Sequence, residues 1–440
     1  MRPVNILVYL LRVGLDLERR LFDTVHFPQH VVVGYGEYTM FKRLHTTIVP
    51  LLLLIAGSVN PLQAASEPKE VTIAGSTISI LQSAGYRVDW INQVPTNELR
   101  LPTILQDSFY TLNDDDYLSR YDSVTGKWLW STPIGNNVFD MLSISSFPRL
   151  DKVYVLSDGL LYSTNNLTGT ATSNGIEKPH VHLRWVPNTP AIVSDNLLVY
   201  GSTKGDLVWL NPSTGAVSAR YQIGDSISSV PVSISALRHP DGRMLELIIG
   251  ASKSGTLVAV DKGSRTQAWR VQLTAPVVAP ISSATNTQLI GEETIPRSSV
   301  FIAGQDQYLR AVDTHTGKPR WRVLTTAPLE DAPAVYGDVL YQQIPGEGLA
   351  CFTTFPQDFS GNRKWTAASV NGAVFTTNAK GRLVTWDASA KVLQILDPFN
   401  GTVIRTLALP EAKNVLTDSV QNGSIFILTE NDEIIRLAPR

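Results

Sequence analysis

The sequence predicts an all-β fold made of eight similar four-stranded sheets, and three observations support this. Gly (30 residues) and Pro (26) recur along the 440-residue chain, which suits many short strands joined by tight turns. A turn motif with an Asp or Asn, a Gly four residues later and often a Trp recurs along the chain. Short segments of β character separate its copies. Repeats of about 40–50 residues with this pattern are typical of β-propeller blades.

The clearest copy of the motif is AVDTHTGKPRW, and residues 122–130 repeat it at the same offsets. The Asp bonds to the backbone two residues on, and the Gly supplies the positive φ that reverses the chain. The Trp lies on the outgoing strand, where it fills the gap between adjacent sheets. The residues predicted for these docking turns and their strands are Asp122, Gly126, Trp130, Gly215, Asp261, Trp269, Asp313, Gly317, Trp321, Trp365, Gly401 and Trp90.

Counting the copies gives seven complete blades, with the second and third over 137–180 and 181–224. The last three strands, in VLTDSVQNG, SIFILTEN and EIIRLAP, have no fourth partner at the C-terminal end. GYRVDWINQVP, residues 85–95, resembles the outermost strands of the other blades. We expect it to complete the eighth blade and close the ring, which removes both exposed edges. Seven blades are the alternative, because the second blade lacks a Trp on its outermost strand.

The N-terminal residues predict export. Residues 40–64 begin with Met40, continue with two basic residues and an apolar stretch over 48–59, and end in small residues at Ala64. This order is that of a secretory signal peptide, and the apolar stretch is too short to span a membrane. We therefore expect residues 1–39 to be a non-native upstream extension, 65–84 an N-terminal segment, and 85–440 the propeller. A tethered protein with a cytoplasmic extension is the alternative.

Composition excludes several classes of function. Charged residues make up 17% of the chain and the net charge is −2, which gives no electrostatic reason to expect a nucleic-acid partner. Cys351 is the single cysteine, so no intramolecular disulfide and no Cys-based metal or haem motif can form.

Three consecutive aspartates, Asp114, Asp115 and Asp116, are candidates for a metal site. They lie one hairpin before a docking turn, in register with STKGD (202–206) and NAKGR (378–382), which could not ligate a cation. A calcium loop needs oxygen ligands at alternate positions, a Gly at the sixth and a Glu at the twelfth, and this stretch does not match. We predict a hairpin turn and no metal.

His180 and His182 in HVHLRW are a second candidate, because residues two apart lie on the same side of an extended strand. No nearby carboxylate or third His completes a metal site. We predict a partly solvated strand that joins two blades.

The motif AVDTHTGKPRW resembles the tryptophan-docking repeat of pyrroloquinoline-quinone-like propellers, a family that includes quinoprotein dehydrogenases and BamB-like outer-membrane assembly factors. The resemblance covers residues 70–440. Alcohol-oxidising quinoproteins place two adjacent cysteines against the cofactor, whereas Cys351 has no neighbour. We expect no cofactor. A quinoprotein-type dehydrogenase that binds pyrroloquinoline quinone with calcium, and a ligand-binding periplasmic propeller, are the alternatives.

The compact blades and the export signal resemble the BamB-like members more closely. In those proteins the ring is a docking surface, which implies a non-catalytic, monomeric scaffold here. The scaffold would be periplasmic or secreted, with no transmembrane span in the mature chain. It would bind protein partners in outer-membrane protein assembly. BamB-like proteins are usually anchored by a lipidated cysteine, and no Cys lies directly after the apolar stretch in this chain.

Overall fold

The computed structural model describes residues 72–94, 99–135, 138–171, 180–238, 242, 244–290, 293–356 and 359–440, with backbone alone at 235–238, 287–290 and 293–296. The predicted extension at 1–39, the signal peptide at 40–64 and the start of the N-terminal segment lie outside these residues. Across the described part of the chain, no helix has the length and apolar character needed to cross a membrane.

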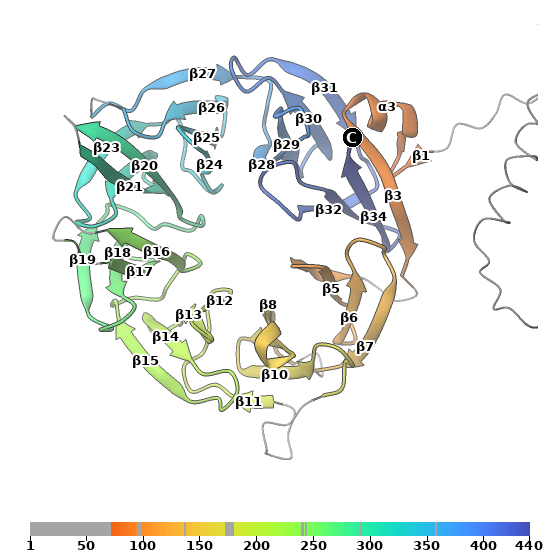
Figure 1. Cartoon of the computed structure of the whole chain (residues 1–440), viewed down its shortest axis with the longest axis horizontal. Helices are drawn as coiled ribbons and strands as arrows, with labels where there is room; N and C mark the ends of the chain where they lie inside the picture. Colours follow the sequence, from red (N-terminus) through yellow and green to blue (C-terminus); the bar gives the residue numbers. More distant parts are fainter. Residues whose placement is uncertain are drawn as a thin grey trace, which may run out of the picture. The chain divides into compact units, whose positions relative to one another are not determined.

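Eight four-stranded antiparallel sheets follow one another around a ring, as predicted (Figure 1). In each blade the first strand is innermost and the fourth is outermost. Blades one to four contain β4 (Arg100–Leu105), β5 (Ser108–Leu112), β6 (Tyr117–Asp122), β7 (Trp128–Pro133); β8 (Met141–Phe147), β9 (Lys152–Ser157), β10 (Leu160–Asn165), β11 (His180–His182); β12 (Ile192–Ser194), β13 (Leu197–Gly201), β14 (Asp206–Leu210), β15 (Val217–Gln222); and β16 (Val232–Arg238), β17 (Met244–Ala251), β18 (Thr256–Asp261), β19 (Gln267–Gln272).

The remaining blades repeat this order. Blades five to eight contain β20 (Ser282–Ile290), β21 (Glu293–Ala303), β22 (Tyr308–Asp313), β23 (Pro319–Leu324); β24 (Ala334–Tyr336), β25 (Val339–Ile344), β26 (Gly348–Thr353), β27 (Arg363–Ala367); β28 (Ala373–Thr377), β29 (Leu383–Asp387), β30 (Val392–Leu396), β31 (Val403–Ala408); and β32 (Ala412–Thr417), β33 (Ile425–Thr429), β34 (Glu433–Pro439), with β3 (Tyr86–Gln93) as the fourth strand. A short 3-10 helix, Pro148–Leu150, lies between β8 and β9.

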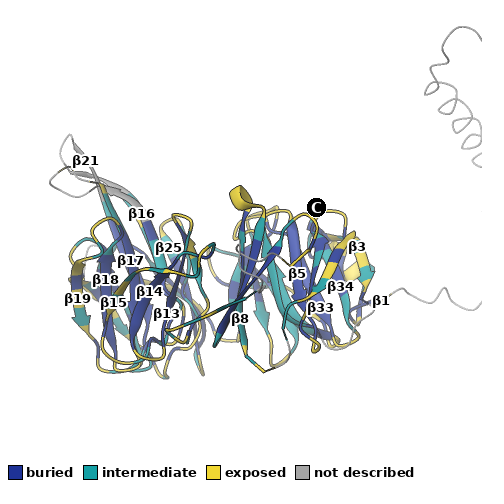
Figure 2. Cartoon of the chain, turned by 90° about the horizontal axis from the view of Figure 1, so that it is seen from below, coloured by how far each residue is buried: buried dark blue, intermediate teal, exposed yellow. Residues whose placement is uncertain are grey.

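The middle strands of each blade form the core. All residues of β5, β14 and β33 are buried, whereas the outermost strands β15 and β19 alternate or expose most residues (Figure 2). A middle strand contacts the neighbouring blades on both faces, so it carries an almost continuous apolar sequence. An outermost strand is covered on one face only, so its polar and apolar residues tend to alternate.

The ring closes through strands from opposite ends of the chain. β3 pairs with β34 along its whole length, from Tyr86 opposite Pro439 to Gln93 opposite Glu433. Eight blades and closure by an N-terminal strand are therefore confirmed. The predicted boundary between blades two and three is wrong, because residues 180–182 form β11. This strand pairs with β10 as the outermost strand of blade two.

Residues 72–84 contain structure that the sequence did not predict. β1 (Thr72–Ile73) pairs with β2 (Ser76–Thr77), and α3 (Ile78–Ser83) follows directly. Ile73 and Leu81 pack into one apolar cluster with Leu407 of blade seven and Ile435 of blade eight. Because the third and fourth strands of blade eight come from opposite chain ends, no turn joins them. The N-terminal segment fills the junction beside them.

Candidate functional site

The docking turns share one hydrogen-bond pattern. In the first, Asp122 Oδ1 accepts from the backbone amides of Val124 (3.0 Å) and Thr125 (2.7 Å), and the Gly126 amide donates to the Asp122 carbonyl (2.9 Å). The bond from the Thr125 amide holds the pKa of Asp122 below its usual range. Gly126 has φ +73°, the left-handed conformation that Gly adopts without strain. The turn at Asp313 has the same two hydrogen bonds to its Oδ1, and at Asp261 the Ser264 amide donates to Oδ1.

Each docking Trp lies against the turn of the next blade. A Cβ placed on Gly317 would lie 2.7 Å from Trp269 Cε3, and the Trp269 indole nitrogen donates to the Thr314 carbonyl at 2.7 Å. Trp321 makes the same type of bond to the Thr354 carbonyl. The structure brings together the pairs Trp90 and Gly126, Trp130 and Gly169, Trp269 and Gly317, Trp321 and Gly361, and Trp365 and Gly401.

Three of the eight junctions in the described ring lack this Trp–Gly pair. Between blades seven and eight no docking turn forms, because β34 and β3 come from opposite ends of the chain. In blade two the side chain against Gly215 is Val181, because the short strand β11 carries no Trp. In blade three the Trp has moved one strand inward: Trp209 of β14 is opposite Ala219 of β15, whereas Ala259 is opposite Trp269 in blade four. The sequence does show this exchange, as a Trp in the third strand and a small residue in the fourth.

An Arg replaces the Gly of the turn that faces Trp209. Arg265 has φ +60°, and its guanidinium carbon lies 5.0 Å from the centre of the Trp209 ring. Trp209 is fully buried. A cation–π contact therefore replaces the indole–Gly contact that five other junctions have.

The three aspartates lie in the turn between β5 and β6, as predicted, but they are not equivalent. Asp114 and Asp115 are exposed, whereas Asp116 is fully buried and forms an ion pair with Arg100. The register with NAKGR was wrong, because residues 378–382 join the first two strands of blade seven rather than its middle strands. We therefore expect replacement of Asp116 to cost stability, because it would leave the charge of Arg100 without this partner.

The two histidines lie side by side on β11, with ring centres 5.6 Å apart. The prediction that they join two blades is wrong, because β11 is the outermost strand of blade two. Among the residues that the structure describes, no three His, Cys, Asp or Glu side chains form a group that could hold a metal.

Cys351 is buried opposite Trp365, and burial raises the pKa of its thiol to about 11.

One face of the ring carries two long hairpins. β16–β17 of blade four and β20–β21 of blade five join first to second strands, so their tips lie on the same face as the docking turns. β20 and β21 pair over nine positions, from Ser282 opposite Phe301 to Ile290 opposite Glu293. β22 pairs with β21 only over Ser299–Ala303. β21 therefore extends beyond its ladder with β22 toward this face.

Two cavities open on the same face. One, of about 290 Å³, lies between blades five and six and is lined by basic and aromatic side chains, including Arg320 and Phe355. The other, of about 380 Å³, lies between blades six, seven and eight and is lined by Tyr336, Tyr341 and amide side chains. Burial raises the pKa of Tyr336 to about 12, so its hydroxyl stays protonated at neutral pH.

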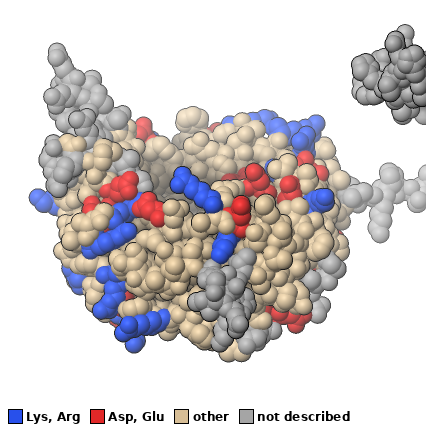
Figure 3. Space-filling model, turned by 60° about the horizontal axis from the view of Figure 1, so that its bottom comes forward, with Lys and Arg blue, Asp and Glu red and all other residues tan. Residues whose placement is uncertain are grey.

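Basic side chains gather on the left flank of the ring in Figure 3. The outermost strands of blades three, four and five contribute Arg220, Arg270 and Arg322, which are all exposed. Arg322 lies 5.2 Å from the centre of the Tyr308 ring, which partly covers its charge.

A family model described as outer membrane protein assembly factor BamB matches residues 74–243 and 253–414. The chain belongs to this family. A search among curated proteins finds no match. The crystal structure of BamB from Moraxella catarrhalis is similar, with a TM-score of 0.57 and 14% identity over 80% of this chain and 97% of that one.

A computationally designed protein, Ika8, is also similar, with a TM-score of 0.56 and 11% identity over 79% of this chain and 98% of that one. Likenesses at these identities show the fold alone, because one ring fold serves many functions.

Proposed function

We propose that the chain is an exported, non-catalytic scaffold that binds protein partners in the periplasm and acts in outer-membrane protein assembly. Membership of the BamB family supports the assembly role. The residue order over 40–64 supports export. The observation that carries the proposal is the pair of projecting hairpins of blades four and five.

The hairpins offer backbone groups to another chain. Among the described residues, the ladder from β22 reaches only Ser299, so the part of β21 before it has one paired side. Such an edge can accept an extended strand, which binds through main-chain hydrogen bonds. The ring below holds the hairpins in place, because each blade packs against its neighbours through the docking turns.

Site-specific photo-crosslinking in the native envelope tests this function. A photoreactive residue at Met244, at the start of β17, or at Thr285 in β20 should capture a component of the outer-membrane assembly machinery. Leu324 provides a matched control, because it is as exposed as Met244 (60%) but lies at the end of a fourth strand, on the opposite face. Equal capture of that component from Leu324, or none from the hairpins, contradicts the proposal.

The proposal includes no resident cofactor. We expect the purified protein to show no absorbance change with pyrroloquinoline quinone and calcium, and no dye-linked oxidation of alcohols or sugars. Stoichiometric uptake with turnover would assign the chain to the quinoprotein dehydrogenases instead.

A further inference from the structure

The cavity between blades six, seven and eight is lined by aromatic and uncharged polar side chains. It has a volume of about 380 Å³. Among the described residues, its polar lining consists of Tyr336, Tyr341, Thr377, Asn378, Gln421 and Asn422. The structure describes the chain segments that carry these side chains, 334–344 and 373–425, without a gap. Ligand pockets have volumes of roughly 300–1,000 Å³, so this cavity has room for a small ligand.

Two tyrosines from the first hairpin of blade six form one wall of the cavity. Tyr336 is in β24 and Tyr341 is in β25, and their ring centres lie 5.8 Å apart at an interplanar angle of 61°. Tyr341 is 3% exposed, and its hydroxyl has no hydrogen-bond partner among the described residues. The hydroxyl oxygen is not sealed from solvent, so it opens to the cavity that Tyr341 lines. Because buried polar groups are normally hydrogen-bonded, this hydroxyl is a candidate for a ligand contact.

Two long loops supply the amide side chains of the cavity. Residues 418–424 join the first two strands of blade eight, and residues 378–382 join those of blade seven. The same connection has two residues in blades one, three and six, which is enough to turn the chain. The longer loops bring Asn378, Gln421 and Asn422 to the cavity. Their extra length therefore serves the cavity and is not needed for the turn.

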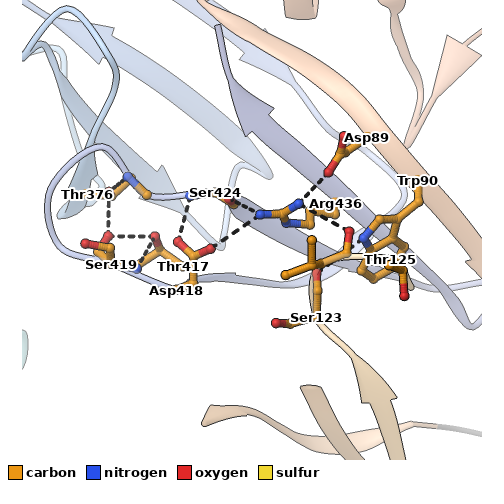
Figure 4. Close-up of polar contacts among 12 residues, drawn as sticks. Asp89, Trp90, Ser123, Thr125, Thr376, Thr417, Asp418, Ser419, Ser424 and Arg436 are labelled. Atoms are coloured by element: carbon orange, nitrogen blue, oxygen red, sulfur yellow. Dashed lines mark hydrogen bonds and ion pairs between the residues drawn. The ribbon is translucent and has the colours of Figure 1, made fainter. Parts of the chain in front are cut away.

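The loop of blade eight is anchored to blade seven (Figure 4). Thr376 Oγ1 donates to the Ser419 carbonyl at 2.7 Å. The Asn422 amide donates to Thr377 Oγ1 at 3.1 Å, and Asn422 has φ +51°, a left-handed conformation. The side chains of Gln421 and Asn422 are exposed and make no hydrogen bond to a described residue. The loop therefore holds its backbone in place and leaves two amide groups, each a donor and an acceptor, open to a ligand.

We propose that this cavity binds an uncharged sugar unit of a glycan. A sugar ring has an apolar face of C–H groups that packs on an aromatic ring, as the Tyr336 ring would do here. Its hydroxyl groups both donate and accept hydrogen bonds, and so do phenol and amide side chains. Tyr341, Gln421 and Asn422 would bind these hydroxyl groups. The cavity belongs to blades six to eight and the projecting hairpins to blades four and five, so the inference adds a glycan site and does not depend on the proposed function.

Saturation-transfer difference NMR with the uncharged trisaccharides maltotriose, cellotriose and triacetylchitotriose tests the proposal. The full-length protein should bind at least one of them with a Kd of about 1 mM or below. Asn422→Gly removes one amide and keeps the backbone, because Gly adopts positive φ without strain. This variant and Gln421→Ala should each weaken binding by about threefold or more. Asn196→Gly is the matched control, because Asn196 is also exposed, at φ +63°, in the first turn of blade three, and it should bind as the wild type does.

Four results would overturn the inference: no binding of any of these sugars up to about 10 mM, no loss in either cavity variant, an equal loss in Asn196→Gly, or tighter binding of the acidic trigalacturonic acid than of every uncharged trisaccharide. A neutral peptide, N-acetyl-Ser-Asn-Ser-amide, tests the other class of ligand. If it binds more tightly than all the sugars, the cavity is a peptide site and the inference is wrong. Equal unfolding midpoints of the two Gly variants would show that weaker binding is not a loss of fold.

Discussion

Arg436 and Asp89 form an ion pair that joins the two ends of the propeller (Figure 4). Arg436 is in β34, the last strand of the chain, and Asp89 is in β3, the N-terminal strand that completes the same blade. Arg436 Nη2 also donates to Ser424 Oγ at 2.9 Å and lies 3.9 Å from Asp418. The side chain of Arg436 in the third strand therefore bonds to the fourth strand and to the loop between the first and second strands of blade eight.

Replacement of Asp89 tests this closure. Asp89→Asn should lower the free energy of unfolding by about 1–2 kcal/mol, because the charge of Arg436, with 14% of its side chain exposed, loses its closest partner. Chemical denaturation measures the change. Arg87→Gln serves as the control, because Arg87 also pairs with Asp89 but is 63% exposed. If both variants lose the same small amount, the ladder alone closes the ring.

The contact between Trp269 and Gly317 predicts a steric effect. Gly317→Ala should destabilise the fold by about 1 kcal/mol from its left-handed backbone and by about 1–3 kcal/mol more from the clash with the indole. Gly381→Ala isolates the first effect, since Gly381 has the same φ of +69° and nothing within 4 Å of an added Cβ. Equal losses in the two variants would show that the indole does not press on the turn.

Trp321 should contribute far more to stability than an exposed Trp. It is 2% exposed, so we expect Trp321→Ala to cost about 3–5 kcal/mol in denaturant unfolding. Trp128, on the outermost strand of blade one, is 56% exposed, and its replacement with Ala should cost less than about 1 kcal/mol. A loss below about 1 kcal/mol for Trp321 would contradict the docking role.

Between Asp115 and Asp116, only the replacement of Asp116 should lower the free energy of unfolding substantially. Asp116→Asn keeps the size of the side chain and tolerates the φ of +56°, but it removes the charge that faces Arg100. We expect a loss of about 2 kcal/mol, against about 0.5 kcal/mol or less for exposed Asp115→Asn. The unfolding midpoint of the wild type should not rise with calcium. A calcium-dependent rise that Asp116→Asn abolishes would restore the metal interpretation.

The repeat made most of the fold predictable, because its turn residues act locally. An Asp that bonds to its own turn and a Gly at positive φ need no knowledge of distant residues. Their spacing therefore favoured eight blades over seven and pointed to Trp90 as part of the last blade. Structure that depends on partners far along the chain was missed. The helix α3 has no periodic pattern of its own, and it forms where Leu81 meets blades seven and eight.

The candidate site was less predictable than the fold. Asp114, Asp115 and Asp116 look alike in the sequence, and only the ring shows that the third turns inward to Arg100. The cavity between blades five and six depends on Arg297 and Phe359, which lie on different blades. Bringing such residues together requires the packing of whole sheets, which a local motif does not encode.

The binding of an assembly partner to the projecting hairpin tests the central claim most directly. Residues 287–296 would be replaced by Asn-Gly, a two-residue turn that should close the hairpin after the pair Asn286 and Arg297. Calorimetry would compare the affinities of this variant and the wild type for the periplasmic domain of the host's outer-membrane barrel-assembly protein. We predict that the shortened variant binds at least about tenfold more weakly while its unfolding midpoint is unchanged. Equal affinity of the two proteins would contradict the account.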